Sequence, residues 1–316
     1  MKNNLFISTG YFATFTSSII LDFQKSKKMR NKNNYLLIII SKEFSNDEEF
    51  DTEVKSQIHF ARSVGIWHKI DVVKEQDFPL SVYNTKNYDD NLIKLLFNGD
   101  LINKSFFEVY VSSLNILSKL SIIFSKSNII DEGIGTYLQL QTAKNLKEFS
   151  NFYKIIPLDN INKINNIDLP KLLLYKKLKK LNRIYKTPKI TEKTSFVAIS
   201  SFYFIVDEKS KLIESYKSYI SDLVKNGENV KIKLHPRNNK NDFLDFKNNL
   251  LEINIPLLDM YLIKNRKYIK TLFSMNSSIL FMAKYVYNIP TKFIETDVKD
   301  EYTNNINNIY VKHINN

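Results

Sequence analysis

Residues 128–137 have the sequence NIIDEGIGTY, an apolar run that ends on two adjacent carboxylates, Asp131 and Glu132. Two glycines follow, although the whole chain contains only six. The pattern predicts a buried strand over 128–130 and a turn at Gly133, where glycine permits a positive φ or a close approach of a ligand. The two acids are then expected to lie in a cleft, and they direct attention to polar residues at other strand ends.

Around this stretch, the first half of the chain alternates strand and helix patterns. Apolar runs predict strands over 5–8, 35–40, 66–73, 106–111 and 128–130. Apolar residues at helical spacing predict helices over 12–23, 46–64, 90–97 and 114–124. This alternation is typical of a parallel, doubly wound sheet, in which ligands bind beyond the carboxyl ends of the strands.

The alternation weakens between 138 and 193 and then begins again. Strands are predicted over 196–199, 230–234, 251–253, 268–273 and 291–294, and helices over 209–225, 243–250, 257–263 and 277–287. With 316 residues, two domains are expected. The simplest architecture is therefore α/β, with two Rossmann-like doubly wound domains in series that face each other across a cleft.

We place the domain boundaries at 1–170 for an N-terminal Rossmann-like domain and at 195–316 for a C-terminal Rossmann-like domain. Residues 171–194 are interpreted as a basic linker. Within it, 172–189 has the sequence LLLYKKLKKLNRIYKTPK. This stretch is interpreted as a solvated helix that packs on the domain through four leucines, and the alternative is a helix on anionic lipid. The leucines are Leu172, Leu173, Leu178 and Leu181.

The composition, with 43% hydrophobic and 25% charged residues, is that of an ordinary globular protein. The absence of cysteine excludes disulfides and thiolate chemistry, and four histidines leave little material for a metal cluster. We find no signal-peptide pattern and no apolar window of about 18 residues. A net charge of +13 suits a polyanionic partner, but the abundance of Lys, Asn and Ile throughout the chain explains it equally well.

Two more groups of polar residues follow predicted strands. His235-Pro236 follows the strand over 230–234, with Lys233 before it and Arg237 after it, and Ser277-Ser278 opens a predicted helix. Each has an ordinary interpretation when taken alone: an acid pair or a serine can cap a helix, and a residue before proline is often extended. All three groups, in this order and at strand ends, indicate a site.

In this order and chemistry the three groups resemble those of bacterial sialyltransferases of the GT-B type. The resemblance is to the lipooligosaccharide sialyltransferases of glycosyltransferase family 52 and to the capsular polysialyltransferases. It implies an inverting single displacement of sialic acid from CMP-sialic acid to a hydroxyl of a surface glycan, either lipooligosaccharide or capsule. Such a reaction needs a base for the acceptor hydroxyl and a cationic surface for the departing phosphate.

The resemblance implies roles for individual residues. His235, flanked by Lys233, Pro236 and Arg237, would contact or protonate the CMP phosphate. Ser277 and Ser278 would bind that phosphate, Asp259 would hold the ribose hydroxyls, and Gly10 and Gly133 would lie on the acceptor side. The base is Asp131 or Glu132, whose run DEGIGTY is similar to that of the polysialyltransferases, or Asp207, which suits the lipooligosaccharide branch.

We expect no metal cofactor, because no Asp-x-Asp motif stands at a strand end and Asp89-Asp90 is interpreted as a helix start. The expected partners are CMP-sialic acid and a glycan acceptor. A homodimer is left open, and nucleic acid is not expected because no nucleic-acid motif is found. The expected location is the cytoplasm, with peripheral attachment to the inner face of the inner membrane as an alternative. Two other functions remain open: a GT-B enzyme with another nucleotide sugar, and a basic protein that binds nucleic acid or membrane.

Overall fold

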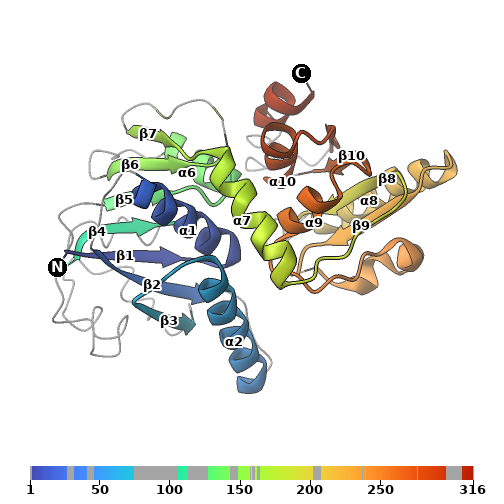
Figure 1. Cartoon of the computed structure of the whole chain (residues 1–316). Coiled ribbons are helices and arrows are strands. Elements are labelled where there is room, and N and C mark those ends of the chain that lie inside the picture. Colours follow the sequence, from blue (N-terminus) through green and yellow to red (C-terminus); the bar gives the residue numbers. More distant parts are fainter. Residues whose placement is uncertain are drawn as a thin grey trace. The chain divides into compact units, whose positions relative to one another are not determined.

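The computed structural model of the chain is an α/β structure (Figure 1). It describes residues 2–26, 32–40, 46–74, 106–112, 127–142, 149–156, 158, 161, 164–201, 208–236, 238–275, 277–296 and 308–315. The helices predicted over 90–97 and 114–124 lie outside these ranges, as do Asp89-Asp90, Asp207 and Arg237. Their predictions therefore stay predictions.

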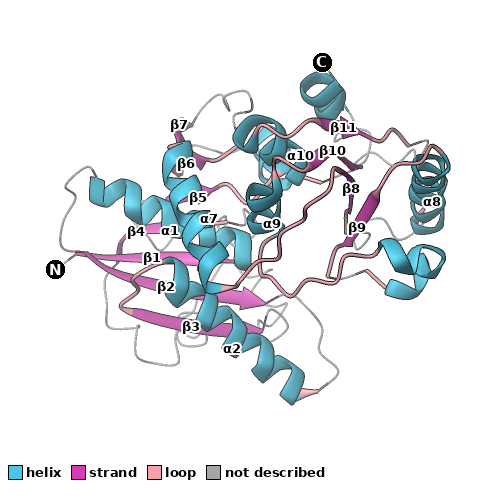
Figure 2. Ribbon diagram, turned by 45° about the vertical axis from the view of Figure 1, so that its right-hand side comes forward, coloured by secondary structure: helices cyan, strands magenta, loops and turns pink. Residues whose placement is uncertain are grey.

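The chain divides into two compact units, Met1–Lys177 and Leu178–Asn316. The division falls inside the stretch that the sequence analysis assigns to a linker. Each unit is built around a sheet of parallel strands with helices beside it, which Figure 2 shows in magenta and cyan. The predicted fold class, two Rossmann-like α/β domains, agrees with this organisation.

The first unit contains a seven-stranded parallel sheet in the order β3-β2-β1-β4-β5-β6-β7. Its strands are β1 (Lys2–Ser8), β2 (Lys32–Ile40), β3 (Lys69–Lys74), β4 (Phe106–Val111), β5 (Ser127–Ile130), β6 (Phe149–Lys154) and β7 (Asn165–Asp168). The helices are α1 (Tyr11–Ser26), α2 (Asp47–Val64) and α6 (Ile134–Thr142). The first five strands confirm the predicted alternation, whereas β6 and β7 were not predicted.

Local sequence explains most of these elements. Residues 35–40 of β2 are all buried, as expected for a strand covered on both faces. The helix α2 begins where Asn46 accepts a hydrogen bond from the backbone N–H of Glu49 at 2.8 Å, and acids fill its first turn. It ends at Gly65, whose backbone N–H donates to the carbonyl of Ala61.

A chain of asparagine side chains crosses β5, β6 and β7. Asn151 donates to Asn128 at 2.7 Å, and Asn165 donates to Asn151 at 2.6 Å. These residues are also partners in the strand register. The side-chain amides therefore pair polar residues of three strands, which is why strands as polar as NNID can join the sheet.

The second unit contains a four-stranded parallel sheet in the order β11-β10-β8-β9. Its strands are β8 (Thr194–Ile199), β9 (Val230–Leu234), β10 (Ile269–Ser274) and β11 (Thr291–Phe293). The helical segments are α8 (Lys209–Lys225), η2 (Lys240–Asn249), α9 (Leu258–Asn265), α10 (Ile279–Phe281), η3 (Met282–Tyr287) and η4 (Val311–Asn315). All four strands and the exact bounds of α8 were expected.

Two predictions for the second unit are wrong in detail. Residues 251–253 are not a strand: the segment touches β9 through one isolated bridge between Leu250 and Ile232 and one hydrogen bond from the Leu251 N–H to the Ile232 carbonyl. The expected helix over 243–250 is instead a 3₁₀ segment, η2, interrupted by non-helical angles at Phe243 and Phe246.

The basic stretch forms the helix α7 (Lys171–Ile184). Leu174, Leu178 and Leu181 are fully buried, and each contributes about 1.5–3 kcal/mol by burial. The expectation that Leu172 packs on the domain is wrong, because its side chain is 63% exposed. Lys177 is buried and pairs with Asp22 of α1 at 2.8 Å. The helix is thus anchored rather than a free linker.

In the part of the chain that the structure describes, no helix is both long and apolar enough to cross a membrane.

Candidate active site

In the first unit, polar residues that follow three different strands converge at one edge of the sheet. In doubly wound sheets ligands bind where the strand order reverses, and in this sheet that point lies between β1 and β4. Thr9 follows β1, Ser112 follows β4 and Glu132 follows β5. Thr9 Oγ1 and Ser112 Oγ are 3.3 Å apart, so the two strand ends meet there.

Glu132 is the partly exposed carboxylate of this group. Thr9 Oγ1 donates to Glu132 Oε2 at 2.6 Å. Burial raises the pKa of Glu132 to about 7, while hydrogen bonds from Thr9 and Ser112 lower it and the nearby charge of Asp131 raises it. A carboxylate with a pKa near neutrality can take a proton from a hydroxyl and release it again.

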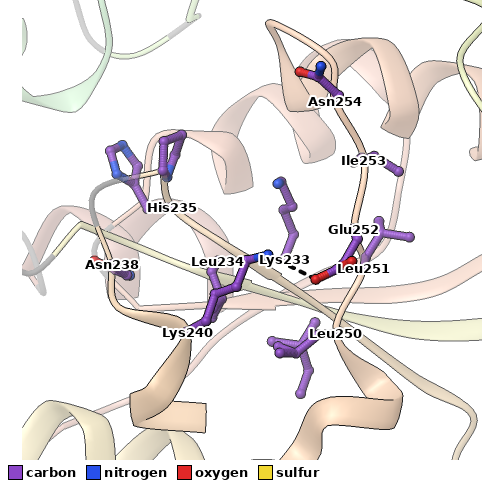
Figure 3. A pocket seen from close by; sticks show the side chains of 12 residues that line it. Lys233, Leu234, His235, Asn238, Lys240, Leu250, Leu251, Glu252, Ile253 and Asn254 are labelled. Atoms are coloured by element: carbon purple, nitrogen blue, oxygen red, sulfur yellow. Dashed lines mark hydrogen bonds and ion pairs between the residues drawn. The ribbon is translucent and has the colours of Figure 1, made fainter. Parts of the chain in front are cut away.

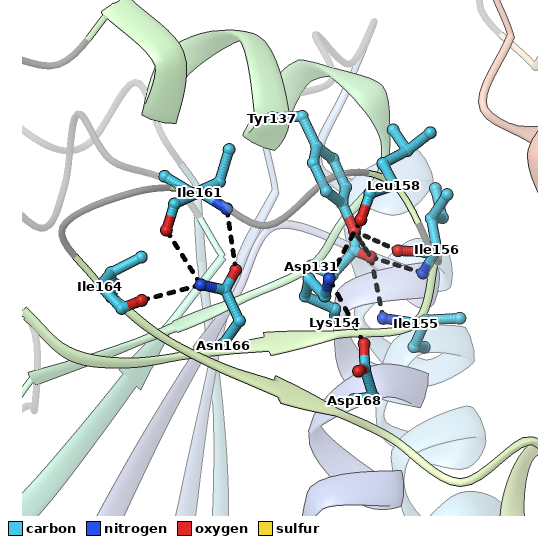
Figure 4. A network of polar contacts seen from close by, with 10 residues as sticks. All are labelled: Asp131, Tyr137, Lys154, Ile155, Ile156, Leu158, Ile161, Ile164, Asn166 and Asp168. Atoms are coloured by element: carbon cyan, nitrogen blue, oxygen red, sulfur yellow. Dashed lines mark hydrogen bonds and ion pairs between the residues drawn. The ribbon is translucent and has the colours of Figure 1, made fainter. Parts of the chain in front are cut away.

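Asp131 has a different environment, because its side chain is completely buried. Figure 4 shows its hydrogen bonds: the backbone N–H groups of Ile155 and Ile156 each donate to Oδ2 at 2.9 Å, and the Tyr137 hydroxyl lies 3.0 Å from the same oxygen. Burial raises the pKa of Asp131, and the hydrogen bonds, led by that of Ile156, oppose this. The carboxylate joins the end of β5 to the end of β6.

The turn after Asp131 explains the glycine that the sequence places there. The Gly133 N–H donates to Asp131 Oδ1 at 2.9 Å, and Gly133 has a φ of 126°. This conformation favours glycine. Gly10, after β1, has a φ of 150° and lies next to Thr9 in the same group of strand ends.

The structure therefore separates the two adjacent acids. Asp131 is occupied by the protein's own donors, while Glu132 is partly exposed at the point where the strand order reverses. The third candidate base, Asp207, lies outside the described residues. Of Asp131 and Glu132, only Glu132 is partly exposed.

In the second unit, a pocket of about 400 Å³ lies beside the end of β9. This volume is within the usual range for small-molecule sites. Figure 3 shows its two walls: Lys233 and His235 from β9 and the turn after it, and Glu252 and Asn254 from the segment that follows η2. Pro236 also lines it. Lys233 and His235 are two residues apart, so both can face the same side of the strand.

The pocket is rich in cations. Lys240 Nζ pairs with Glu252 Oε1 at 2.8 Å across its lining. Burial lowers the pKa of Lys233, and the charge of Lys240 lowers it further, while Glu252 raises it. Because Lys233 is partly desolvated, an anion bound beside it would interact more strongly than with an exposed lysine.

Ser277 and Ser278 follow β10 and are partly exposed. Their carbonyls accept from the N–H groups of Leu280 and Phe281, so they begin the helical segment formed by α10 and η3. They do not line the pocket beside His235. In the sheet order β8 stands between β9 and β10, and the three carboxyl ends share one edge because all are parallel.

Asp259 lies on α9 with its side chain only 5% exposed. The Tyr287 hydroxyl donates to Asp259 Oδ1 at 2.5 Å. Burial raises the pKa of Asp259, while this hydrogen bond lowers it. Like Asp131, this acid is used inside the protein, and we leave it out of the proposed ribose contacts. Arg237 lies outside the described residues.

Four residues that contact the strand ends were not predicted as site residues: Thr9, Ser112 and Asn238, which follow strands, and Tyr216, which lies on α8. The first two could have been found, because each directly follows a predicted strand. Asn238 donates through its side chain to the Ser200 carbonyl at 2.7 Å and through its backbone to the His235 carbonyl at 2.9 Å. It thereby ties the turn that carries His235 to the end of β8.

Tyr216 performs a similar task from α8. Its hydroxyl accepts from the Met275 N–H at 2.9 Å and lies 3.3 Å from Ser200 Oγ. One buried hydroxyl thus contacts the chain beyond β8 and beyond β10. No sequence pattern marks this residue, because its contacts lie 16 and 59 positions away.

Among the described residues, no group of three or more His, Cys, Asp or Glu side chains could hold a metal ion.

Comparison with solved structures shows the fold. The UDP-GlcNAc 2-epimerase from Methanocaldococcus jannaschii is similar with a TM-score of 0.53 and 12% identity, covering 94% of this chain and 85% of that chain. The same enzyme in complex with UDP-GlcNAc and UDP has a TM-score of 0.54 and 10% identity, over 93% of this chain and 83% of that chain. These likenesses, together with the two parallel sheets, show the GT-B fold class, with two Rossmann-like domains.

An alpha/beta-galactoside alpha-2,3-sialyltransferase from the luminous marine bacterium Photobacterium phosphoreum is 14% identical over 99% of this chain and 96% of that chain, with a TM-score of 0.48. No curated protein sequence matches the chain. Among protein families, residues 4–295 match alpha-2,8-polysialyltransferase (POLYST). This match covers both units and every strand end described above, and the chain therefore belongs to the alpha-2,8-polysialyltransferase family.

Proposed function

We propose that the chain transfers sialic acid from CMP-sialic acid to a hydroxyl group of a surface glycan, lipooligosaccharide or capsule, by an inverting single displacement. The family match over residues 4–295 is the observation that carries this proposal. Two observations of geometry support it: Glu132 in the first unit is a carboxylate with a raised pKa, and Lys233 and His235 line one pocket in the second. The donor, the mechanism and the acceptor are parts of the proposal.

Glu132 is the proposed base. The acceptor hydroxyl gives its proton to Glu132 Oε as the oxygen attacks the anomeric carbon, and the bond from that carbon to the CMP phosphate oxygen breaks. The pKa of about 7 supports this role, because the group is then ionised in half of the molecules near neutral pH and still binds a proton well. Asp131 holds the turn that presents Glu132.

His235 and Lys233 are proposed to stabilise the departing CMP. The leaving phosphate oxygen gains negative charge as the sugar departs, and a cation or a proton donor beside it lowers the barrier. Lys233 and His235 line one pocket of suitable size. Ser277 and Ser278 are proposed to bind the same phosphate through the start of the helical segment that follows β10.

We further propose that the reaction needs no metal ion, because the CMP donor carries a single phosphate that protein cations can neutralise. Dialysis against a chelator should leave the rate of CMP release unchanged. Loss of activity in chelator with recovery in Mg²⁺ or Mn²⁺ would contradict this part alone.

The direct test is the release of CMP from CMP-sialic acid in the presence of a galactose-terminated or sialylated acceptor. Wild type should release CMP, and His235→Ala should lower the rate by about a hundredfold or more, a size typical for loss of a group that stabilises the leaving charge. His59→Ala, at an exposed position of α2, is the matched control and should retain full activity. Equal rates for wild type and His235→Ala would overturn the mechanism.

Donor identity has its own test. CMP should inhibit the reaction and stabilise the protein against heat, whereas UDP and GDP should do neither at the same concentration. Stabilisation by UDP rather than by CMP would indicate that the donor is another nucleotide sugar.

A further inference from the structure

The helix α7 (yellow-green in Figure 1) has two faces of opposite character. One face is buried through Leu174, Leu178 and Leu181. On the other, Leu172, Lys176, Lys179 and Arg183 follow one another at spacings of three or four residues, so they form a single exposed stripe, with Lys180 beside it. The inner face of α7 packs within the protein, so the exposed outer face is the one that another molecule could contact.

The charged side chains of α7 itself all have one sign. The sequence of α7, KLLLYKKLKKLNRI, contains no acidic residue. Lys177 is the cation that points inward, where its Nζ pairs with Asp22 and donates to the Ser18 carbonyl at 3.1 Å. Asp22, the partner of Lys177, is partly exposed. The exposed cations of α7 are Lys171, Lys176, Lys179, Lys180 and Arg183.

Exposed apolar side chains accompany these cations. Leu172 is 63% exposed and lies on the stripe, whereas Ile184 is 41% exposed and lies about a third of a turn around the helix from it, on the side of Lys177. Ile66, at 77% the most exposed large apolar residue described, follows the end of α2. Lys177 Nζ donates to the Val64 carbonyl at 2.5 Å, so the end of α2 contacts α7. Three of the six exposed large apolar residues described are thus on α7 or beside it.

We infer that the outer face of α7 binds an anionic lipid surface, with the cations at the headgroups and Leu172, Ile184 and Ile66 inserted among them. Clustered lysines and arginines bind anionic lipid, each contributing through the surface potential. Apolar side chains inserted at the boundary between headgroups and acyl chains add affinity that does not depend on charge. This inference is independent of the proposed activity, since it concerns no residue of the candidate site.

Lipid suits this face better than nucleic acid does. Single-stranded nucleic acid is bound by cations together with aromatic stacking platforms, whereas the exposed stripe of α7 has Leu172 among its cations, with Ile184 and Ile66 to one side. An exposed leucine or isoleucine gains little from a phosphate backbone. In a membrane interface the same side chain leaves water.

The test is co-sedimentation of the full chain with vesicles. Wild type should bind vesicles of phosphatidylglycerol mixed with phosphatidylcholine and should not bind phosphatidylcholine alone. Replacing Lys176, Lys179, Lys180 and Arg183 together by glutamine should lower the partition coefficient by about a hundredfold or more. Leu172→Ser combined with Ile184→Ser keeps every charge and should lower it by about tenfold.

The matched control replaces Lys225, Lys247, Lys267 and Lys292 by glutamine, since these are exposed lysines of the second unit that lie off α7. It removes the same charge and should bind vesicles like wild type. Equal losses in the control and the α7 variant would show attraction by net charge and overturn the assignment. Binding to single-stranded DNA that depends on the four α7 cations, without vesicle binding, would overturn it in favour of nucleic acid. Thermal unfolding of each variant shows whether its fold is intact. If the glutamine variant of α7 unfolds, a variant in which Lys176, Lys179 and Lys180 are replaced by arginine decides the test, because it keeps the charge and should bind vesicles like wild type.

Discussion

At the scale of single residues, Asp131 and Glu132 are neighbours in sequence that differ in surroundings. The sequence analysis could name both acids but could not choose between them. The difference comes from the backbone N–H groups of Ile155 and Ile156, which reach Asp131 across 24 and 25 positions. These donors lie at the end of β6, a strand whose sequence pattern was too polar to predict. The burial of Asp131 could therefore not be predicted either.

The pKa of Glu132 leads to a prediction about rate and pH. If Glu132 is the base, kcat/KM should fall about tenfold per pH unit below a pKa of about 7, because the protonated carboxyl cannot accept a proton. Thr9→Val removes a hydrogen bond that lowers this pKa, so the acidic limb of the profile should move to higher pH. The measurement is the pH dependence of CMP release.

Two variants sharpen this test. Ser112→Ala removes the second hydrogen bond that lowers the pKa of Glu132 and should move the limb in the same direction. Thr52→Val, on the exposed part of α2, should leave the profile unchanged. A limb that stays in place in both Thr9→Val and Ser112→Ala would exclude Glu132 as the titrating group.

Substitutions of Asp131 and Glu132 should have opposite effects on the free energy of unfolding. Asp131→Asn places an amide NH₂ among buried donors that need an acceptor, so we expect a loss of about 2–4 kcal/mol in the free energy of unfolding. The measurement is denaturant unfolding at neutral pH. A loss below about 0.5 kcal/mol, the size of a surface substitution, would show that the buried hydrogen bonds of Asp131 are not needed.

Glu132→Gln should instead stabilise the chain at alkaline pH. The pKa of Glu132 in the folded chain, about 7, lies above its ordinary value of 4.5. The folded state therefore holds this proton more tightly, and wild type loses stability as the pH rises between these values. Glu132→Gln should exceed wild type by about 3 kcal/mol near pH 8 and equal it near pH 4. A difference that does not vary with pH would contradict the raised pKa.

At the scale of elements, the apolar strands could be predicted and the polar ones could not. Residues 35–40 and 194–199 are buried throughout, so burial alone selects a strand there. The strand β7, NNID, joins the sheet only because Asn165 pairs with Asn151. Such a cross-strand pair links residues 14 positions apart and leaves no local periodicity. The segment 251–253 failed for the converse reason: Leu251 and Ile253 are apolar, but the link to β9 consists of the isolated bridge of Leu250 and the hydrogen bond of the Leu251 N–H.

The contacts of α8 lead to a prediction for Tyr216. Tyr216→Phe keeps the ring but leaves the buried Met275 N–H without its acceptor, which should cost about 1–3 kcal/mol. Because that N–H stands two residues before Ser277, the KM for CMP-sialic acid should rise more than kcat falls. Tyr219→Phe, one turn away, keeps its ring against Phe273 and should change neither quantity by a factor of two or more. Equal effects in the two variants would remove Tyr216 from the positioning of the site.

At the scale of the whole molecule, the fold class followed from the alternation of strands and helices, and the strand ends gave the candidate residues. The proposed roles divide between the units, with the base at the reversal point of the seven-stranded sheet and the phosphate-binding groups at the end of the four-stranded sheet. Sequence reasoning could propose this division because each motif stands in a different half of the chain. It could not predict that Ser277 and Ser278 lie outside the pocket beside His235.

The division of roles predicts that donor binding and proton transfer can be separated by single substitutions in different units. CMP at about a hundred times its dissociation constant should stabilise wild type by about 2.7 kcal/mol, which raises the Tm by several degrees. Glu132→Gln should retain this stabilisation while losing turnover, because the first unit supplies only the base. His235→Ala, in the second unit, should lose most of the stabilisation together with turnover. Differential scanning calorimetry with and without CMP measures the first quantity, and CMP release measures the second. If Glu132→Gln abolished the response to CMP and His235→Ala preserved it, the proposed assignment of the donor to the second unit would have to be reversed.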